Sequence, residues 1–363
     1  MSVVGAPAEE STVVPLQVVQ RVAVVGLGRA GVAHAVMLAH IPGCELIAAA
    51  DPRASARAAL RGMGFAAPAF NRVERLLEQV RPDAVVVCTA QHERARVAQM
   101  VLEAGIPVLV ERPMARTLEE AEALVRLAGD RRVPLAVGHP LAYDPVFARV
   151  HEIVRAGALG AVRHARSAMF VSRVFAQRPR RGPGRLDPKR VAGGVLAHLA
   201  SDLLFVLVRM LGVPAEVRAD WSLLYGAVED ELHGMMTLPD GVEVGFDCSW
   251  SVPGYTRAST VIELDGPAGK LLASDEALEV ELSRAAAGFP SGYSRMRDAD
   301  FPAPARFDFG GETLWSHDAG FLDWVAGGPV PPNEAFAALD THRVMDALYR
   351  SAAAGGVTVK VAS

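Results

Sequence analysis

The chain has 363 residues, of which 51% are hydrophobic and 21% are charged, and its formal net charge at pH 7 is −4. This composition is typical of a globular protein of about two domains and excludes an intrinsically disordered chain. The charge is nearly balanced apart from a short Arg-rich run at 178–185, so the sequence lacks the broad basic face that nucleic-acid binding requires.

Residues 1–20 are predicted to form a flexible extension. They contain an acidic pair and no basic start, unlike a secretory signal peptide. The three cysteines of the chain are far apart and show no metal-ligand spacing. Such a sparse, odd set is typical of a reducing compartment, so we expect a cytoplasmic protein with neither disulfides nor a metal site.

Residues 21–141 are predicted to form a dinucleotide-binding domain. Short apolar runs alternate there with stretches of helical length. The apolar runs lie at 21–25, 45–50, 84–88, 107–110 and 135–137, and the helical stretches include 53–63 and 118–128. Continuous apolar strands are typical of a parallel sheet buried on both faces, and their alternation with helices indicates a Rossmann-type, doubly wound α/β fold.

Residues 142–363 are predicted to form an α+β domain for substrate binding and oligomerisation. Helices are expected at 145–156, 193–211, 315–326 and 334–354, and strands at 162–174, 215–225, 229–238, 241–250 and 258–265. Turn signals at 239–241 and 265–266 indicate hairpins, and hence a mostly antiparallel sheet. Residues 284–308 are expected to be irregular. The apolar helix near 193–211 carries charged residues, which argues against a membrane span.

A glycine-rich turn is the strongest local motif of the first domain. It follows the first predicted strand and opens a helix, and it reads Gly26, Leu27, Gly28, Arg29, Ala30 and Gly31. Glycines at this spacing permit a tight turn, approach of the backbone to a pyrophosphate, and close packing of helix on strand. The motif therefore predicts a bound dinucleotide, with a purely structural βαβ unit as the alternative.

Asp51 ends the second predicted strand, twenty residues beyond the last glycine of the turn. A carboxylate at this place accepts hydrogen bonds from the adenosine ribose hydroxyls and repels a 2′-phosphate. We therefore expect NAD as the cofactor. Arg53 leaves NADP open, because it could pair with a 2′-phosphate.

From about residue 20 onward, the chain resembles the Gfo/Idh/MocA oxidoreductases, a family named after glucose–fructose oxidoreductase, inositol dehydrogenase and MocA. The resemblance is carried by the glycine-rich turn and by segments 83–89, 104–113, 117–121, 137–139, 143–145, 185–194 and 345–352. It implies hydride transfer between NAD(P) and a hydroxyl, carbonyl or imine carbon, often of a sugar or cyclitol. It also implies an open-faced sheet that makes a homo-oligomer.

The resemblance implies a nicotinamide side lined by Thr89, Ala90, His92, Glu111 and Arg112. The family's catalytic set is a Lys, here replaced by Arg112, together with an Asp and a His four residues apart on a helix. Those two positions hold His198 and Asp202, in reversed order. Arginine keeps the positive charge but cannot relay a proton.

His198 and Asp202 would share one face of a regular helix, so the imidazole could serve as general base beside the carboxylate. The alternative is a hydrogen-bonded pair of structural value only. The family's usual Pro is Ala90 and its usual His is Arg94. Three other side chains are further candidates for the proton donor: Tyr143, His139 and His92.

We therefore expect an NAD(P)-dependent oxidoreductase for a small polar substrate, with Arg112, His198 and Asp202 as its catalytic residues. The altered catalytic set keeps two alternatives open. One is a dinucleotide-binding sensor or accessory protein without redox turnover, and the other is a hydrolase or lyase that uses bound NAD transiently.

Overall fold

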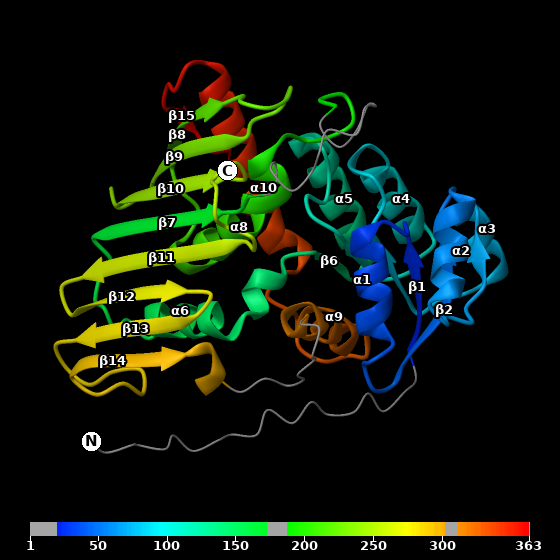
Figure 1. The fold of residues 1–363 in the computed structure, drawn as a ribbon, viewed down its shortest axis with the longest axis horizontal. Helices are drawn as coiled ribbons and strands as arrows, with labels where there is room; N and C mark the ends of the chain where they lie inside the picture. The colour runs from blue at the N-terminus through cyan, green and yellow to red at the C-terminus, as the bar shows by residue number, and fades with distance from the viewer. Residues whose placement is uncertain (1–19, 173–186, 302–310, 363) are drawn as a thin grey trace.

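The computed structural model describes residues 20–172, 187–301 and 311–362. The predicted extension and the Arg-rich run at 178–185 therefore lie outside the described residues, except for residue 20. Two sheets with their helices lie side by side (Figure 1). Helices α9 and α10, near the end of the chain, lie between them.

The first sheet is six-stranded and parallel, which confirms the predicted fold class. Its order is β3-β2-β1-β4-β5-β6. The strands are β1 (Gln20–Val25), β2 (Cys44–Ala50), β3 (Ala69–Phe70), β4 (Ala84–Val87), β5 (Val108–Val110) and β6 (Leu135–Val137). Strand β3 was not predicted, because two residues are too few to show a hydrophobic pattern.

Helices cover both faces of this sheet. They are α1 (Arg29–Leu38), α2 (Ala54–Gly62), α3 (Val73–Gln79), α4 (Gln91–Glu103) and α5 (Leu118–Arg131). In β1, Val22 and Val24 belong to the core on the side of α1 and α9 (Glu312–Val325), whereas Ala23 and Val25 belong to the core that includes α4 and α5. Burial on both faces explains why the strands are continuous apolar runs.

The second sheet has nine strands in the order β14-β13-β12-β11-β7-β10-β9-β8-β15, and only the β7–β10 pair is parallel. Its strands are β7 (His164–Phe170), β8 (Glu216–Ser222), β9 (Glu231–Thr237), β10 (Glu243–Ser249), β11 (Ser259–Gly266), β12 (Gly269–Ser274), β13 (Ala277–Leu282), β14 (Gly292–Arg297) and β15 (Val359–Lys360). Both predicted hairpins are present, as the β9–β10 and β11–β12 pairs. The expectation that 284–308 is irregular was wrong for β14, an edge strand without buried apolar residues to mark it.

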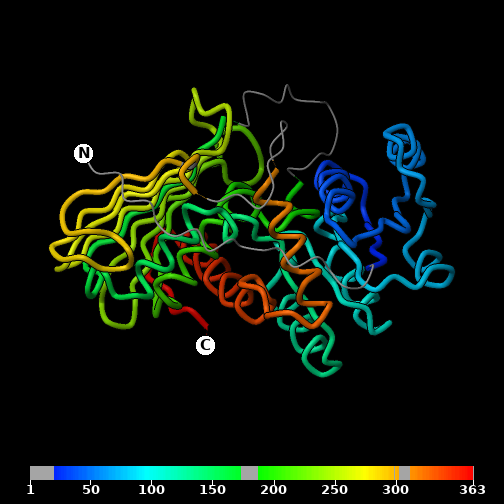
Figure 2. Tube along the Cα trace, turned by 90° about the horizontal axis from the view of Figure 1, so that it is seen from below, coloured from blue at the N-terminus to red at the C-terminus, as the bar shows by residue number. Residues whose placement is uncertain are grey.

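Helices α6 (Pro145–Arg155), α8 (Ser201–Leu211) and α10 (Ala335–Ala353) lie on one face of the second sheet. No helix of the described residues covers the other face in Figure 1, and Figure 2 shows α10, in red and orange, to one side of the strands. In β10 the side chains of Val244, Phe246 and Cys248 are buried beneath this helical layer. The alternating pattern matches a sheet covered on one side.

Short helical turns complete the fold: η1 (Pro140–Tyr143), η2 (Leu196–Ala200) and η3 (Asp298–Asp300). Because α9 packs on α1 and α10 packs on α5, the end of the chain joins the two sheets. Within the described residues, no helix combines the length and the apolar character that a bilayer crossing needs.

Candidate active site between the two sheets

The glycine-rich turn connects β1 to α1. Its three glycines are present for different physical reasons. Gly26 has φ +94°, and a Cβ there would lie 2.6 Å from the backbone carbon of Cys88. A Cβ on Gly31 would lie 1.8 Å from the carbonyl oxygen of Gly26. Packing against neighbouring backbone therefore leaves no room for a side chain at either position. A Cβ on Gly28 would meet nothing within 4 Å, so this residue leaves open space at the start of α1.

The start of α1 is suited to an anion. Gly28 is its N-cap and provides no side-chain cap, and the first turn of the helix contains no acidic residue. Free N–H groups and the positive end of the helix dipole favour a phosphate at such a place. Leu27 is buried and Arg29 is exposed, with Ala30 between these extremes.

Asp51, at the end of β2, is buried behind the turn. Its carboxylate accepts hydrogen bonds from the backbone N–H groups of Leu27 and Arg53, each at 2.8 Å. The Arg53 guanidinium adds two more, at 2.9 Å from Nε and 2.7 Å from Nη2. Burial opposes ionisation of Asp51, but these hydrogen bonds outweigh it and lower the pKa of the carboxyl. Asp51 thus fixes both the turn and Arg53.

The loop after β4 and the first turn of α4 provide unpaired polar atoms. Within the described part of the chain, the buried Oγ1 of Thr89 and Nδ1 of His92 have no hydrogen-bond partner. The other ring nitrogen of His92 lies 3.2 Å from Nη2 of Arg190, and Ala90 is exposed. Because buried polar atoms are normally paired, these atoms mark places where a bound molecule can supply the partner.

Three side chains from separate parts of the chain meet at the centre of the site. Nη2 of Arg112 lies 3.4 Å from Oδ2 of Asp202, and Nδ1 of His139 lies 3.4 Å from Oδ1 of Asp202. Both contacts are within ion-pair distance, and neither has hydrogen-bond geometry. Arg112 Nε, His139 Nδ1 and Asp202 Oδ1 are buried atoms without a hydrogen-bond partner in the described structure. Burial lowers the pKa of His139, although Asp202 acts in the opposite direction.

The helix that carries His198 and Asp202 is not regular. The expected helix over 193–211 begins with the π-helical turn η2 and continues as α8. A π turn pairs residues five apart, so side chains four apart no longer stack on one face. Gln91 Nε2 lies 3.3 Å and 3.4 Å from the two ring nitrogens of His198, and the ring of Trp250 is 6.1 Å away. Asp202, not His198, therefore faces Arg112.

Two glycines precede this helix, and close neighbours at both positions leave no room for a side chain. A Cβ on Gly193 would lie 1.9 Å from the hydroxyl of Tyr349, and one on Gly194 would lie 2.0 Å from the carbonyl oxygen of Glu229. The Glu229 carboxylate accepts hydrogen bonds from Gly194 N and Leu196 N, at 2.7 Å and 3.2 Å, and from the Tyr349 hydroxyl at 2.8 Å. The start of the helix is held against the second sheet.

A buried polar network lies behind Glu111. His34 on α1 places Nε2 3.4 Å from Glu111 and Nδ1 2.8 Å from Asp318 on α9. The same Asp318 carboxylate lies 2.9 Å from His317. Burial opposes protonation of His34, but Asp318 outweighs it and the pKa of His34 is raised. This network was not predicted from the sequence. Its only local sign is a titratable side chain in each of two largely apolar helices, His34 in α1 and Asp318 in α9.

The site fits a dinucleotide. Gly28 leaves open space at an uncapped helix start, Asp51 is ionised behind the turn, and Thr89 and His92 present unpaired atoms. All of these groups lie at the carboxyl ends of parallel strands, where ligands bind in doubly wound sheets.

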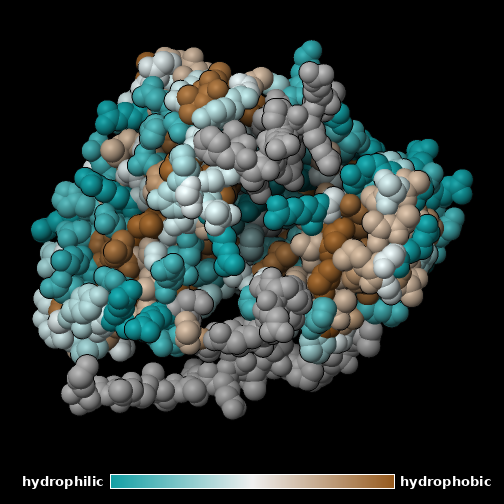
Figure 3. Space-filling model, viewed as in Figure 1, coloured by the Kyte–Doolittle hydropathy of each residue, from teal (hydrophilic) through white to brown (hydrophobic). Residues whose placement is uncertain are grey.

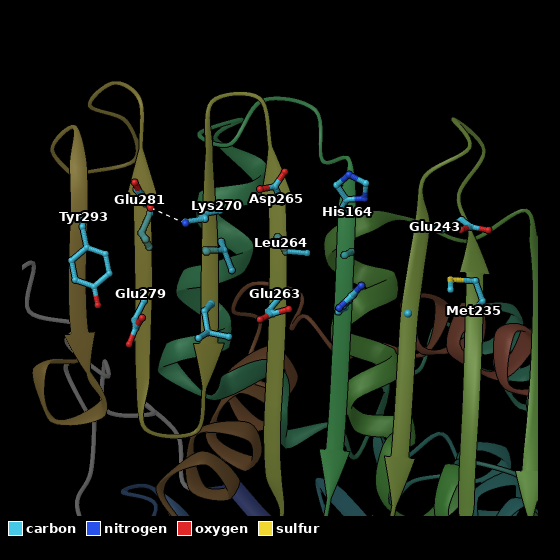
Figure 4. A pocket seen from close by; sticks show the side chains of 16 residues that line it. His164, Met235, Glu243, Glu263, Leu264, Asp265, Lys270, Glu279, Glu281 and Tyr293 are labelled. Carbon is cyan, nitrogen blue, oxygen red and sulfur yellow. Dashed lines mark ion pairs between the residues drawn. The ribbon is translucent and has the colours of Figure 1, made fainter.

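The open face of the second sheet holds a separate hollow of about 720 Å³. Figure 4 shows the side chains that line it, which come from seven consecutive strands of the sheet, from β14 to β9. They include His164, Arg166, Glu263, Lys270, Glu279 and Tyr293. The helices of the domain lie behind the strands, so this hollow is not part of the site described above.

Comparisons with known proteins cover both sheets. A model of an oxidoreductase family with an NAD-binding Rossmann fold matches residues 20–139, and a model of the GFO/IDH/MocA C-terminal domain matches residues 147–272. The chain is 24% identical over 308 residues to an inositol 2-dehydrogenase of Corynebacterium glutamicum, and this match covers 84% of each protein.

Solved structures share the fold. GenD2 from gentamicin A biosynthesis, in complex with NAD, is 27% identical with a TM-score of 0.77. This match covers 95% of the present chain and 97% of GenD2. Levoglucosan dehydrogenase in complex with NADH and levoglucosan is 20% identical with a TM-score of 0.84, and the match covers 95% of the present chain and 100% of that protein.

Proposed function

The chain belongs to the Gfo/Idh/MocA family of NAD-binding oxidoreductases, and from this premise we propose that Arg112, Asp202 and His139 form its catalytic centre. The oxidoreductase activity and the NAD cofactor predicted from the sequence agree with the family. What we add is the choice of His139, in place of His198, as the third catalytic residue. One observation carries it: Arg112 and His139 each lie 3.4 Å from the Asp202 carboxylate, and each of the three residues has a buried polar atom without a hydrogen-bond partner.

NAD bound at the glycine-rich turn supplies the hydride acceptor for oxidation of an alcohol. Glycines 26, 28 and 31, together with Asp51, would hold its adenosine and pyrophosphate parts, and the residues around Thr89 and Glu111 would hold its nicotinamide side. The protein must then take up the proton that the alcohol loses.

Each of the three central residues has a distinct role in that proton transfer. His139 is kept neutral by burial, as a general base requires. Asp202 lies between His139 and Arg112, so it can accept the hydrogen bond of a substrate hydroxyl and orient the imidazole. Arg112 keeps its charge and stabilises the developing alkoxide through its donors.

His198 has a different place in this proposal. Its neighbours include the amide of Gln91 and the ring of Trp250. An imidazole, an amide and an indole together can hold hydroxyl groups and the apolar face of a sugar ring. We assign His198 to substrate binding, with proton transfer left to His139 and Asp202.

The substrate is expected to be a small polyhydroxylated ring. Inositol and levoglucosan, which the names of two similar proteins contain, share a ring with adjacent hydroxyl groups. The central cluster offers a carboxylate, an imidazole and a guanidinium to such a pair of hydroxyls. A sugar or cyclitol derivative matches these donors and acceptors.

The open face of the second sheet is proposed to bind a second copy of the chain, in the cytoplasm. On the face viewed in Figure 3, hydrophilic residues cover most of this sheet, and a compact hydrophobic patch lies among them. Both charge signs occur in the hollow, including Arg166, Lys270 and Glu263. A face of mixed charge can pair with its own copy across a two-fold axis.

Two measurements test the proposed function. NADH binding is followed by fluorescence, and reduction of NAD is then followed by absorbance with myo-inositol, levoglucosan and related polyols. Reduction with any of them supports the proposal. Binding without reduction of NAD across the panel would favour a sensor, and a cofactor that survives purification without net reduction would favour a hydrolase or lyase.

A further inference from the structure

Arg94 lies in the first turn of α4 and is buried, with an exposed fraction of 8%. A buried arginine is rare unless its donors are paired. Nη1 donates to the carbonyl oxygens of Arg112 and Pro113, at 2.7 Å and 2.8 Å, and Nη2 donates to that of Thr89 at 2.9 Å. These three hydrogen bonds all go to backbone oxygens, and none of them goes to a carboxylate.

These three oxygens belong to two different loops. Thr89 follows β4, whereas Arg112 and Pro113 follow β5, and the two strands are parallel neighbours. Arg94 therefore joins the carboxyl ends of two strands at the place where the proposed cofactor and substrate sites meet. Each bond involves a charged donor, which makes it stronger than a bond between neutral groups.

A second side chain holds the same segment from the opposite domain. Nε2 of His342, on α10, accepts a hydrogen bond from the N–H of Met114 at 3.2 Å. His342 is buried, and burial lowers its pKa to about 3. The backbone of residues 112–114 is thus held through its carbonyls by Arg94 and through its amide by His342. The guanidinium of Arg112 is left to reach Asp202.

We propose that Arg94 is a positioning residue for Arg112. It fixes the two loops so that the Arg112 guanidinium meets the Asp202 carboxylate, without itself touching the reacting atoms. The role depends on the fork of two separate nitrogens, because one reaches Thr89 and the other reaches Arg112 and Pro113. Lysine keeps the charge but has only one nitrogen, so it cannot hold both loops. The kinetic test of this inference rests on the proposed function, whereas the structural test does not.

The test compares Arg94→Lys with Arg96→Lys in the full-length chain. Arg96 lies two residues further along α4, is exposed, and binds Glu93 at 2.8 Å. In Arg94→Lys, hydrogen exchange measured by mass spectrometry should become faster in segments 88–92 and 111–116 and stay unchanged elsewhere. Arg96→Lys should leave both segments unchanged. This readout requires no substrate, so it stands even if the proposed function fails.

Kinetics with a polyol that the wild type oxidises give the second readout. Arg94→Lys should lower kcat by about tenfold or more, because small displacements of catalytic groups have large effects, while KM for the polyol and the Kd for NADH change by less than about twofold. Added guanidinium ions, well below denaturing concentration, should raise the kcat of Arg94→Ala and have no such effect on Arg96→Ala.

Two results would overturn the assignment. One is a hydrogen-exchange rate in Arg94→Lys that is unchanged in both segments. A rate that rises throughout the chain, as in general destabilisation, counts as the same result. The other is a wild-type kcat in Arg94→Lys. If Arg94→Ala does not fold, the lysine variant still decides the question.

Discussion

The guanidinium of Arg112 lies 3.4 Å from the carboxylate of Asp202, so side chains from the loop after β5 and from helix α8 are in contact. The first residue replaces the lysine expected from the family, and the second occupies the position expected for its histidine. His139 lies against the other oxygen of the Asp202 carboxylate. A cation, an anion and a neutral base therefore lie close together. Arg112, Asp202 and His139 thus form a connected group in three dimensions, of which His198 is not part.

The glycines of the turn make the first prediction. Gly31→Ala should reduce the free energy of unfolding by about 3 kcal/mol, the upper end of the usual cost of overpacking, because its Cβ would collide with the Gly26 carbonyl. Gly28→Ala should change it by less than about 1 kcal/mol, since its Cβ meets open space. Gly28→Ala should instead weaken NADH binding by about tenfold or more, because the backbone must approach the pyrophosphate closely. Denaturant unfolding and NADH fluorescence measure the two effects.

A Gly28→Ala variant with the wild-type Kd for NADH would contradict the assignment of the open space to the pyrophosphate. The Gly31→Ala variant is the matched control, because it tests the same substitution where the neighbouring backbone leaves no room.

The Asp51–Arg53 pair makes the second prediction. Asp51→Ala should lower the ratio of the Kd for NADPH to the Kd for NADH by about tenfold, since the repulsion of a 2′-phosphate is lost and Arg53 is released toward it. Arg53→Gln should raise that ratio, because it frees Asp51 oxygens for the ribose and removes the cation that a 2′-phosphate would need. Fluorescence titration with both cofactors gives the ratios.

Arg61→Gln, on the exposed side of α2, is the control and should leave the ratio unchanged. Equal weakening of NADH and NADPH in Asp51→Ala would show that Asp51 only supports the turn.

His342 makes the third prediction, which concerns pH. Its pKa in the folded protein is lowered to about 3, below the value near 6.5 of an unfolded chain. The unfolded state therefore binds an extra proton between these values, and stability falls as the pH decreases from about 6.5 toward 3. At pH 5 the loss is about 2 kcal/mol.

His342→Gln should reduce this pH dependence, because glutamine can accept the Met114 N–H bond and does not titrate. Urea unfolding at pH 7 and pH 5 measures the difference. His233→Gln, at an exposed strand position, is the control. An unchanged difference between the two pH values in His342→Gln would contradict the prediction.

Sequence reasoning predicted the parts of the fold that depend on local pattern. The first sheet was recognised because its strands are buried on both faces and read as continuous apolar runs. Gly26, Gly28, Gly31 and Asp51 were found because their spacing is local. Strand β14 was missed because its residues are exposed or only partly buried and follow no apolar pattern.

The centre of the site depends on long-range contacts that spacing does not reveal. Arg112, His139 and Asp202 come from three separate segments, and the π turn η2 redirects Asp202 relative to His198. Two of the departures from the family pattern, at Arg94 and Arg112, showed no relation to each other in the sequence. Their connection through the Arg112 carbonyl required the packing of α4 against the loop after β5.

In the mechanism we propose, Asp202 and His139 exchange the proton and His198 does not. The most direct measurement is the kcat of Asp202→Asn, His139→Asn and His198→Asn for the same polyol, with the Kd for NADH of each. We predict that the first two variants lose about 10²- to 10⁴-fold in kcat with NADH binding within about twofold of the wild type. His198→Asn should mainly raise KM. A His198→Asn variant without turnover, beside Asp202→Asn and His139→Asn variants with wild-type kcat, would contradict the account.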